Sequence, residues 1–427
     1  MRVLWVVNSV LPEVLSSLTG QESRVSGSGG WLQASAQVLS SSVDLCVAAV
    51  SDRVTGLYRF DGEKIRYYLL PCGKGNIRVN REYVPFWQRI YDEFKPDLVH
   101  LHGTELPHGL SLMEALPGAV TVISIQGLMS RIWPHFNDGI SRRELLGSIT
   151  LRDLALDLLK PEKMCGTLCS REKNFRLRGR TEPLIFQKAK AVMGRTSWDR
   201  KEVLSMNPEL KYFTCNETLR PQFYEGRWSY GKCTPHTIFL SQAMYPFKGL
   251  HMVLKALPDV LAVYPGTRVV VAGDNILRGD SLSDRLGIDG YALYIKRLMK
   301  RLCLTGKQIF FTGPLDAEGM KEQYLGCNVF INPSAIENSP NSLCEAQMLG
   351  VPCISTDAGG SKDMIPDEKC GKLYSFDDTK RLSSLIIDVF ASSSSFDGSH
   401  EQAVAAARHD PFRNQERLME IYRELTA

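Results

Sequence analysis

The sequence has few of the features that mark nucleic-acid-binding, secreted or membrane-spanning proteins. Its 51 basic and 47 acidic residues leave a formal net charge of only +4, which excludes the strong overall basicity of a dedicated nucleic-acid binder. The apolar run at the amino terminus stops at Asn8, too early for a signal peptide or a membrane span. We therefore expect no nucleic acid among the partners, and the run is predicted to be a buried strand.

Cysteines that could form an obvious set of pairs are also missing. The 11 cysteines, an odd number, are scattered from Cys46 to Cys370, which is typical of reduced thiols in a cytosolic protein. Only Cys165 and Cys169 lie close together, and without a second pair of ligands their spacing favours ordinary thiols over zinc. The sequence therefore predicts a cytoplasmic protein, and peripheral attachment to the inner face of the membrane stays open.

Short β-rich apolar runs alternate with longer amphipathic stretches, the pattern of parallel sheets covered by helices on both faces. At 427 residues the chain is long enough for two such domains, each with its own core. We predict an α/β fold of two doubly wound, Rossmann-like domains. The predicted strands are 3–7, 43–50, 65–70, 98–101, 120–125 and 191–194 in the first series, and 237–240, 268–272, 309–311, 329–331 and 353–355 in the second.

Turn-forming residues between Pro221 and Pro235 separate the two series of strands. The predicted domains are 1–225 and 226–408, followed by a helix within 409–427 that can cross back onto the first domain. This helix has apolar residues at a helical spacing, so that one face can be buried.

Residues 128–182 interrupt the first domain without a convincing strand and are rich in lysine and arginine. One interpretation is a helical insertion with a solvated basic face. The other is a platform for an acceptor that is carried on a lipid phosphate at an anionic membrane surface. The basic residues are Lys160, Lys163, Arg171, Lys173, Arg176, Arg178 and Arg180.

The most informative stretch follows the predicted strand 329–331. It places Glu337 in a loop and Glu345 one turn inside a helix, which Ser339 or Asn341 can cap and Gly350 can end. Both carboxylates therefore lie at the carboxyl end of a parallel strand, where ligands of open α/β sheets bind.

The start of this helix is a predicted anion site, because a helix amino terminus offers free N–H groups. The amides of Asn341, Ser342 and Leu343 are suited to a diphosphate. Glu345 can then accept hydrogen bonds from ribose hydroxyls, while Glu337 faces a sugar ring.

The context of the two carboxylates resembles the donor-binding signature of the family 4 retaining glycosyltransferases, which have the GT-B fold. Glu-x7-Glu lies between Pro-Ser and Glu-Ala-x-x-x-Gly-x-Pro, and Asp-Ala-Gly-Gly-Ser-Lys-Asp follows at 357–363. The resemblance implies two Rossmann-like domains facing a cleft, with Glu337 near the transferred sugar, Glu345 at the ribose and the loop amides at the phosphates. Lys248 resembles the family's lysine that pairs with the donor diphosphate.

Two positions depart from the family pattern. The family usually has an arginine five residues before the lysine, and this chain has Ala243, which leaves more of the leaving-group charge to Lys248. Related enzymes commonly have a histidine at two strand ends. His102 keeps the first, as a catalytic candidate or a structural imidazole, whereas Gln126, an acceptor-side candidate, occupies the second and cannot titrate.

A glycine-rich segment, 27–31, opens a predicted helix. Gly29 and Gly30 would let backbone amides approach a donor phosphate, similar to a Gly-Gly loop of the family. The segment does not fit a Rossmann fingerprint, which would need glycine at Leu32. An NAD enzyme that uses Asp52 is therefore disfavoured.

The resemblance implies a retaining glycosyltransferase of the bacterial surface-polysaccharide type. Its donor would be a UDP- or GDP-sugar, and its acceptor a saccharide or lipid-linked saccharide. Glu337, Lys248 and His102 are the catalytic candidates. No Asp-x-Asp motif is present, so we expect no metal and no cofactor. Two alternatives stay open: a catalytically silent nucleotide-binding subunit and a sugar-nucleotide epimerase of the same fold.

Overall fold

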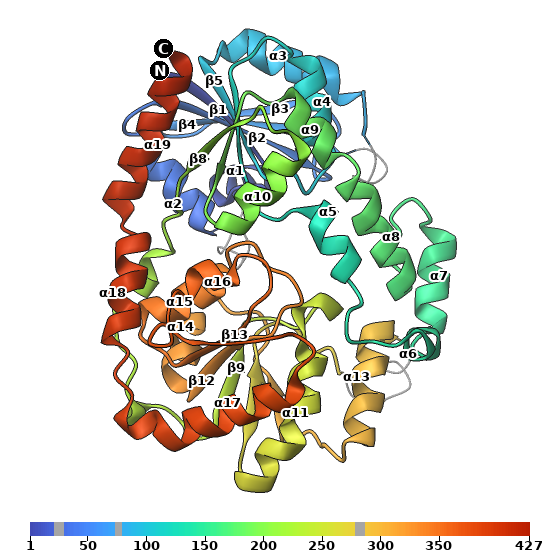
Figure 1. The fold of residues 1–427 in the computed structure, drawn as a ribbon. Helices are drawn as coiled ribbons and strands as arrows, with labels where there is room; N and C mark the ends of the chain where they lie inside the picture. The colour runs from blue at the N-terminus through green and yellow to red at the C-terminus, as the bar shows by residue number, and fades with distance from the viewer. Residues whose placement is uncertain (21–29, 73–78, 278–286) are drawn as a thin grey trace. The chain divides into compact units, whose positions relative to one another are not determined.

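The structure is a computed structural model and describes residues 1–20, 30–72, 79–277 and 287–427. The chain divides into two compact units (Figure 1). Unit 1 comprises Met1–Arg131, Phe175–Arg220 and His409–Ala427, and unit 2 comprises Ile132–Asn174 and Pro221–Arg408. Each unit is built on a largely parallel sheet with helices packed against it, which confirms the predicted α/β class.

Unit 1 contains an 8-stranded sheet in the order β3-β4-β2-β1-β5-β6-β7-β8 among the described residues. All neighbours are parallel except β3 and β4, which are antiparallel. The strands are β1 Arg2–Val7, β2 Asp44–Ser51, β3 Tyr58–Asp61, β4 Ile65–Pro71, β5 Leu98–His102, β6 Thr121–Ser124, β7 Ala191–Gly194 and β8 Lys211–Thr214.

Both faces of this sheet are buried, because alternate side chains of each strand enter separate apolar clusters. Leu4 and Val6 pack on one face with helices α3, α4, α9 and α10, and Val3 and Trp5 pack on the other with α1, α2 and α19. The helices are α1 Pro12–Thr19, α2 Gly30–Leu39, α3 Tyr83–Phe94, α4 His108–Ala115, α9 Glu182–Lys188, α10 Ser197–Met206 and α19 Pro411–Thr426.

Helix α19, at the end of the chain, is part of the unit 1 core. Tyr422 is fully buried, and its hydroxyl accepts a hydrogen bond from Trp5 Nε1 at 2.9 Å and lies 2.5 Å from His100 Nδ1. The two termini consequently lie close together in unit 1 (Figure 1).

Unit 2 contains a parallel 6-stranded sheet in the order β11-β10-β9-β12-β13-β14 among the described residues. Its strands are β9 Thr237–Leu240, β10 Arg268–Val271, β11 Ile309–Phe311, β12 Val329–Asn332, β13 Cys353–Thr356 and β14 Lys372–Tyr374. Its helices are α6 Arg142–Gly147, α7 Leu151–Leu159, α11 Leu250–Val263, α13 Gly290–Arg301, α14 Ala317–Gly326, α15 Asn341–Met348, α16 Ser361–Met364, α17 Thr379–Ser392 and α18 Ser399–Arg408.

The helical insertion, which we expected in the first domain, divides between the units. Residues 132–174 belong to unit 2, where His251 Nε2 lies 2.9 Å from the carbonyl oxygen of Asp138 and Lys255 donates to that of Gly139 at 2.6 Å. Helices α5 (Met129–Ile132) and α8 (Leu168–Gly179) carry the chain across the boundaries.

All 11 cysteines are free thiols, as predicted. In the part of the chain that the structure describes, no helix is both long enough and apolar enough to cross a membrane.

Candidate functional site

Three loops of unit 2 meet at the carboxyl ends of neighbouring strands β9, β12 and β13. The first contains the 3₁₀ turn η4 (Pro246–Lys248), the second runs from β12 to α15, and the third leads from β13 to α16. Backbone bonds join them: Ala335 donates to the carbonyl of Phe247 at 2.7 Å, and Gly360 to that of Glu337 at 3.0 Å. We call these the donor loops.

Lys248 and Glu337 form an ion pair within the donor loops. The distance from Lys248 Nζ to Glu337 Oε1 is 2.5 Å, and both side chains are 15% exposed. The ammonium also lies 5.1 Å from the centre of the Phe247 ring. The structure thus brings together two of the three predicted catalytic residues, with a cation and an anion fixed side by side at the end of the sheet.

Two glycines allow the backbones of the donor loops to lie close together. Gly249 has φ +77°, and a Cβ built on it would lie 1.8 Å from the carbonyl oxygen of Pro333. Gly359 has φ +59°, and its Cβ would lie 1.9 Å from the carbonyl oxygen of Glu337. Any other residue at either position would force the loops apart.

Helix α15 begins at Asn341, as expected, but its cap differs from the prediction. The N-cap is Pro340, which makes no side-chain cap bond, so neither Ser339 nor Asn341 caps the helix. The amide of Leu343 donates to the carbonyl of Pro340 at 3.0 Å in the first turn. The prediction of a phosphate site therefore depends mainly on the amides of Asn341 and Ser342.

Glu345 lies one turn inside α15, at the predicted place, and is buried. Tyr324 of α14 packs against this turn and donates to the carbonyl of Ser342 at 2.9 Å, with Glu345 Oε2 at 3.4 Å. Ala243, where related enzymes have arginine, is also buried and brings no charge to the loops.

His102, the third catalytic candidate, lies in unit 1 at the end of β5. Its ring packs at a tilt against those of His100, with centroids 3.8 Å apart, and Trp5, with centroids 4.3 Å apart. Burial lowers the pKa of His102 to about 3. Its imidazole is therefore neutral near pH 7 and poorly suited to hold a proton there.

Gln126 follows β6 and belongs to a polar network of unit 1 that the sequence did not reveal. Its amide donates to Glu217 Oε1 at 2.6 Å, and Glu217 also forms an ion pair with Arg195. Arg195 follows β7 and donates to the carbonyl of Ile125 at 3.0 Å. The three side chains come from the ends of three neighbouring strands, β6, β7 and β8.

A partly buried carboxyl in unit 1 was also missed. Glu105, just beyond β5, accepts hydrogen bonds from Asn8 Nδ2 at 2.7 Å and from the amide of Gly127 at 2.8 Å, which links the ends of β1, β5 and β6. Burial raises the pKa of this carboxyl. Its one sequence signal is a glutamate shortly after the apolar strand 98–102.

Gly30 is the first residue of helix α2. Gly29 lies outside the described residues, as do Gly27 and Ser28. The predicted contact of this segment with a donor phosphate stays a prediction.

A cluster of side chains that could bind a metal ion lies outside the donor loops. Within the described residues, the cluster of potential ligands is Asp367, Cys370 and His400, which includes no donor-loop residue. Cys165 and Cys169 are not part of this cluster.

Residues 226–410 match the family model described as glycosyl transferases group 1. The Vi polysaccharide biosynthesis protein VipC/TviE of Salmonella typhi is 38% identical over 102 residues, which cover 23% of this chain and 14% of that protein. The curated relatives match over less than half of their own length.

Two solved structures resemble the whole chain at low sequence identity. Sucrose-phosphate synthase from Thermosynechococcus elongatus has a TM-score of 0.68 at 14% identity and covers 99% of this chain and 98% of that chain. Anabaena HepE, solved in complex with UDP-glucose, has a TM-score of 0.66 at 15% identity and covers 99% of this chain and 100% of that chain. Both likenesses concern the fold.

Proposed function

We propose that this chain, whose residues 226–410 match the model of the group 1 glycosyl transferases and whose two units have the GT-B fold, transfers a sugar from a nucleoside-diphosphate sugar to a saccharide or lipid-linked saccharide. The observation that carries the proposal is the partly buried Lys248–Glu337 ion pair at the junction of the donor loops. HepE, which shares the fold, was solved with UDP-glucose, and this makes UDP the first nucleotide to test.

The proposed donor site uses charges and dipoles that the protein fixes in advance. Lys248 and the amides at the start of α15 would stabilise the departing diphosphate, and Glu345 would bind the ribose. No metal is required in this scheme. Because Ala243 supplies no cation, Lys248 carries more of the charge stabilisation than it would beside an arginine.

Transfer with retention would proceed on one face of the sugar, as in the family 4 enzymes that the donor loops resemble. The acceptor oxygen bonds to the anomeric carbon as the bond to the diphosphate oxygen breaks, and the acceptor proton passes to that diphosphate. Glu337 supports the positive charge that develops on the sugar and forms no covalent bond to it. The buried, neutral His102 is not needed as a base.

The test is nucleotide release from UDP-, GDP- and ADP-sugars with free and lipid-linked saccharide acceptors, in the presence of EDTA. We expect Lys248→Met and Glu337→Gln each to lower kcat by about 10²–10³-fold, the usual effect of losing one preorganised charge contact. Lys380→Met and Glu368→Gln, which alter exposed ion pairs of the same unit, serve as matched controls.

The same experiment separates the alternatives. Nucleotide binding without turnover across the panel would support a silent binding subunit, for which Ala243 is the specific observation. Release of nucleotide and free sugar without an acceptor would support an epimerase. Transfer that EDTA abolishes and added Mg²⁺ restores would contradict the metal-independent scheme.

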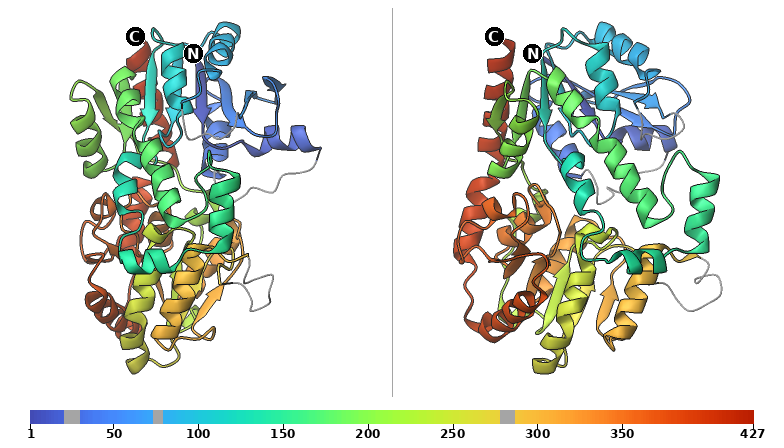
Figure 2. Two further views of the ribbon diagram at one scale, coloured as in Figure 1. Left: turned by 90° about the vertical axis from the view of Figure 1, so that its right-hand side faces the viewer. Right: turned by 45° about the vertical axis from the view of Figure 1, so that its right-hand side comes forward.

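Of the two proposed acceptors we favour the lipid-linked saccharide, because helices α6 and α7 and the turn between them carry exposed apolar side chains. Six aliphatic side chains between residues 146 and 159 are 40–81% exposed. In the right-hand view of Figure 2, α7, drawn in blue-green, lies at the edge of the ribbon. We call this surface the leucine face: Leu146, Ile149, Leu151, Leu154, Leu158 and Leu159.

Helix α7 reverses the usual arrangement of a surface helix: acidic side chains face the protein and leucine side chains face solvent. Its Asp153 is buried, and its Asp157 accepts hydrogen bonds from the amides of Gly166 and Thr167, both at 3.0 Å. Asp157 thus holds the neighbouring chain, while Leu154 and Leu158 face outward. An exposed patch of this size marks a binding surface more often than chance.

Charge around the leucine face favours an anionic membrane as its partner. Arg142, Arg143, Lys160 and Lys163 are exposed beside it, against one exposed acid of residues 142–163, Glu162. Each such cation contributes about 1 kcal/mol at an anionic surface. Apolar side chains framed by lysine and arginine are typical of helices that lie in the membrane interface.

Vesicle co-sedimentation tests this partner. The wild-type chain should bind vesicles that contain phosphatidylglycerol more strongly than vesicles of phosphatidylcholine alone, and salt should weaken the binding. Leu154→Ser/Leu158→Ser should lower the affinity at least tenfold, because burial of one leucine is worth about 1.5–3 kcal/mol. Val263→Ser, at another exposed apolar site of unit 2, is the control. Unchanged binding, or a dimer lost in the double variant, would contradict the membrane assignment.

A further inference from the structure

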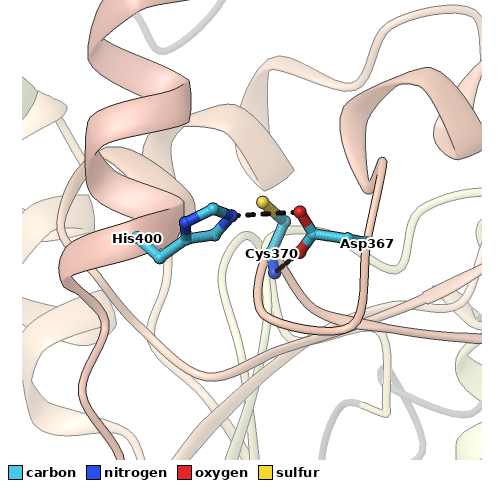
Figure 3. Close-up of side chains that lie close together, drawn as sticks. All are labelled: Asp367, Cys370 and His400. Atoms are coloured by element: carbon cyan, nitrogen blue, oxygen red, sulfur yellow. Dashed lines mark hydrogen bonds and ion pairs between the residues drawn. The ribbon is translucent and has the colours of Figure 1, made fainter.

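A second chemical cluster lies on the loop that follows α16 and on the first turn of α18. Asp367 and Cys370 come from the loop and His400 from the helix, and one ligand atom of each lies within 4.8 Å of the other two (Figure 3). Cys370 is buried, whereas the side chains of Asp367 and His400 are about half exposed. Sulfur, nitrogen and oxygen ligands are thus gathered from two separate parts of the chain.

The carboxylate of Asp367 is oriented before any ligand arrives. Its Oδ1 accepts hydrogen bonds from the amides of Lys369 at 2.8 Å and Cys370 at 3.1 Å. Its Oδ2 lies 3.0 Å from His400 Nε2, as Figure 3 shows. Ligands of tetrahedral zinc lie about 2.0–2.3 Å from the metal and hence about 3.3–3.8 Å from one another, so only a small adjustment would admit the ion.

Two further side chains, those of Gln347 and Arg408, hold the loop and the helix α16 that precedes it. Gln347 Nε2 donates to the carbonyl of Met364 at 2.9 Å and to that of Cys370 at 2.8 Å. Arg408, on the same helix as His400, donates to the carbonyl of Asp363 at 2.8 Å. Outer contacts of this kind orient the ligands of metal sites.

We propose that Asp367, Cys370 and His400 bind one Zn²⁺, with water in the fourth position. The charges of the ion, a thiolate and a carboxylate cancel, and a neutral imidazole completes the protein ligands. The bound ion would clamp the loop to α18. Because Gln347 belongs to α15, the clamp would also steady the helix on which the proposed donor site is built.

Binding must displace a proton. Burial raises the pKa of the Cys370 thiol to about 11, so the free cluster contains the thiol, and zinc binding converts it to a thiolate. The hydrogen bond from His400 lowers the pKa of Asp367, whose carboxylate is ionised beforehand. Formation of the Zn–S bond therefore releases one proton per ion, and affinity should rise with pH.

Titration of the chelator-treated full chain with Zn²⁺ and Co²⁺ tests the proposal without reference to sugar transfer. We expect one ion per chain, a thiolate-to-cobalt charge-transfer band, release of one proton per zinc and a rise in Tm. Cys370→Ser should abolish the band, and His400→Ala, at an exposed position, should lower the affinity at least tenfold. Cys303→Ser, at an exposed cysteine of unit 2, should behave as wild type.

Absence of the band, or a stoichiometry unchanged in both ligand variants, would overturn the proposal and leave a hydrogen-bonded loop in its place. Neither result depends on the proposed transferase activity, because every readout concerns the bound metal.

Discussion

Burial of the Glu401 carboxyl lowers the free energy of unfolding. The side chain is almost fully inaccessible, and neither carboxylate oxygen has a hydrogen-bond partner among the described residues. Burial raises its pKa well above the ordinary value. The folded chain therefore retains a proton that the unfolded chain has lost, and the free energy of unfolding falls by about 1.4 kcal/mol per pH unit between the two pKa values.

Glu401→Gln should accordingly raise Tm at pH 7.5. The gain should disappear near pH 4, where unfolded glutamate is itself protonated. Thermal unfolding followed by circular dichroism across this range is the measurement, with Glu416→Gln, at an exposed site of α19, as the control. A gain that is the same at both pH values would show that protonation is not its cause.

His102 gives a second prediction at the same scale. Since its pKa is about 3, its charge does not change between pH 6 and pH 8. His102→Asn should reduce stability, because the ring packs against His100 and Trp5. It should leave the shape of the pH–rate profile unaltered over this range. Loss of an inflection near pH 6.5 in the variant would instead identify His102 as a titrating catalytic group.

At the scale of elements, the sequence predicted the central strands well and several edge strands not at all. Every predicted strand is present within a residue or two of its expected bounds. The missed strands β3, β8 and β14 all lie at sheet edges. Because an edge strand is covered on fewer sides, it can be short and have few buried side chains: β3, for example, has 4 residues and no fully buried side chain.

The two donor loops that contain Glu337 and Gly359 could be predicted because their residues lie in one motif with a fixed spacing, whereas Lys248 was identified by its resemblance to the family's lysine. The network of Gln126, Arg195 and Glu217 could not, because its members are far apart in the sequence and meet only through the order of β6, β7 and β8. The prediction of the α15 cap was wrong for a local reason. Ser339 and Asn341 are both residue types that favour capping, but the N-cap position is occupied by Pro340.

At the scale of the whole molecule, the boundary within 221–235 agrees with the start of the last segment of unit 2 at Pro221. The larger difference between the prediction and the structure concerns the helical insertion, which was expected in the first domain. Residues 132–174 contact unit 2 through a buried histidine and backbone carbonyls, and neither a charge pattern nor hydrophobic periodicity carries that information.

Unit 1 is assembled from the first, middle and last segments of the chain, and Tyr422 fills its core beside Trp5. A nascent chain that contains only the first half of the protein therefore leaves part of one apolar face of that sheet without helix α19. The face can be closed only after residues 409–427 have left the exit tunnel. The earliest unit to be synthesised is thus the last to be finished, and during that interval it is exposed to aggregation and is a natural client of chaperones.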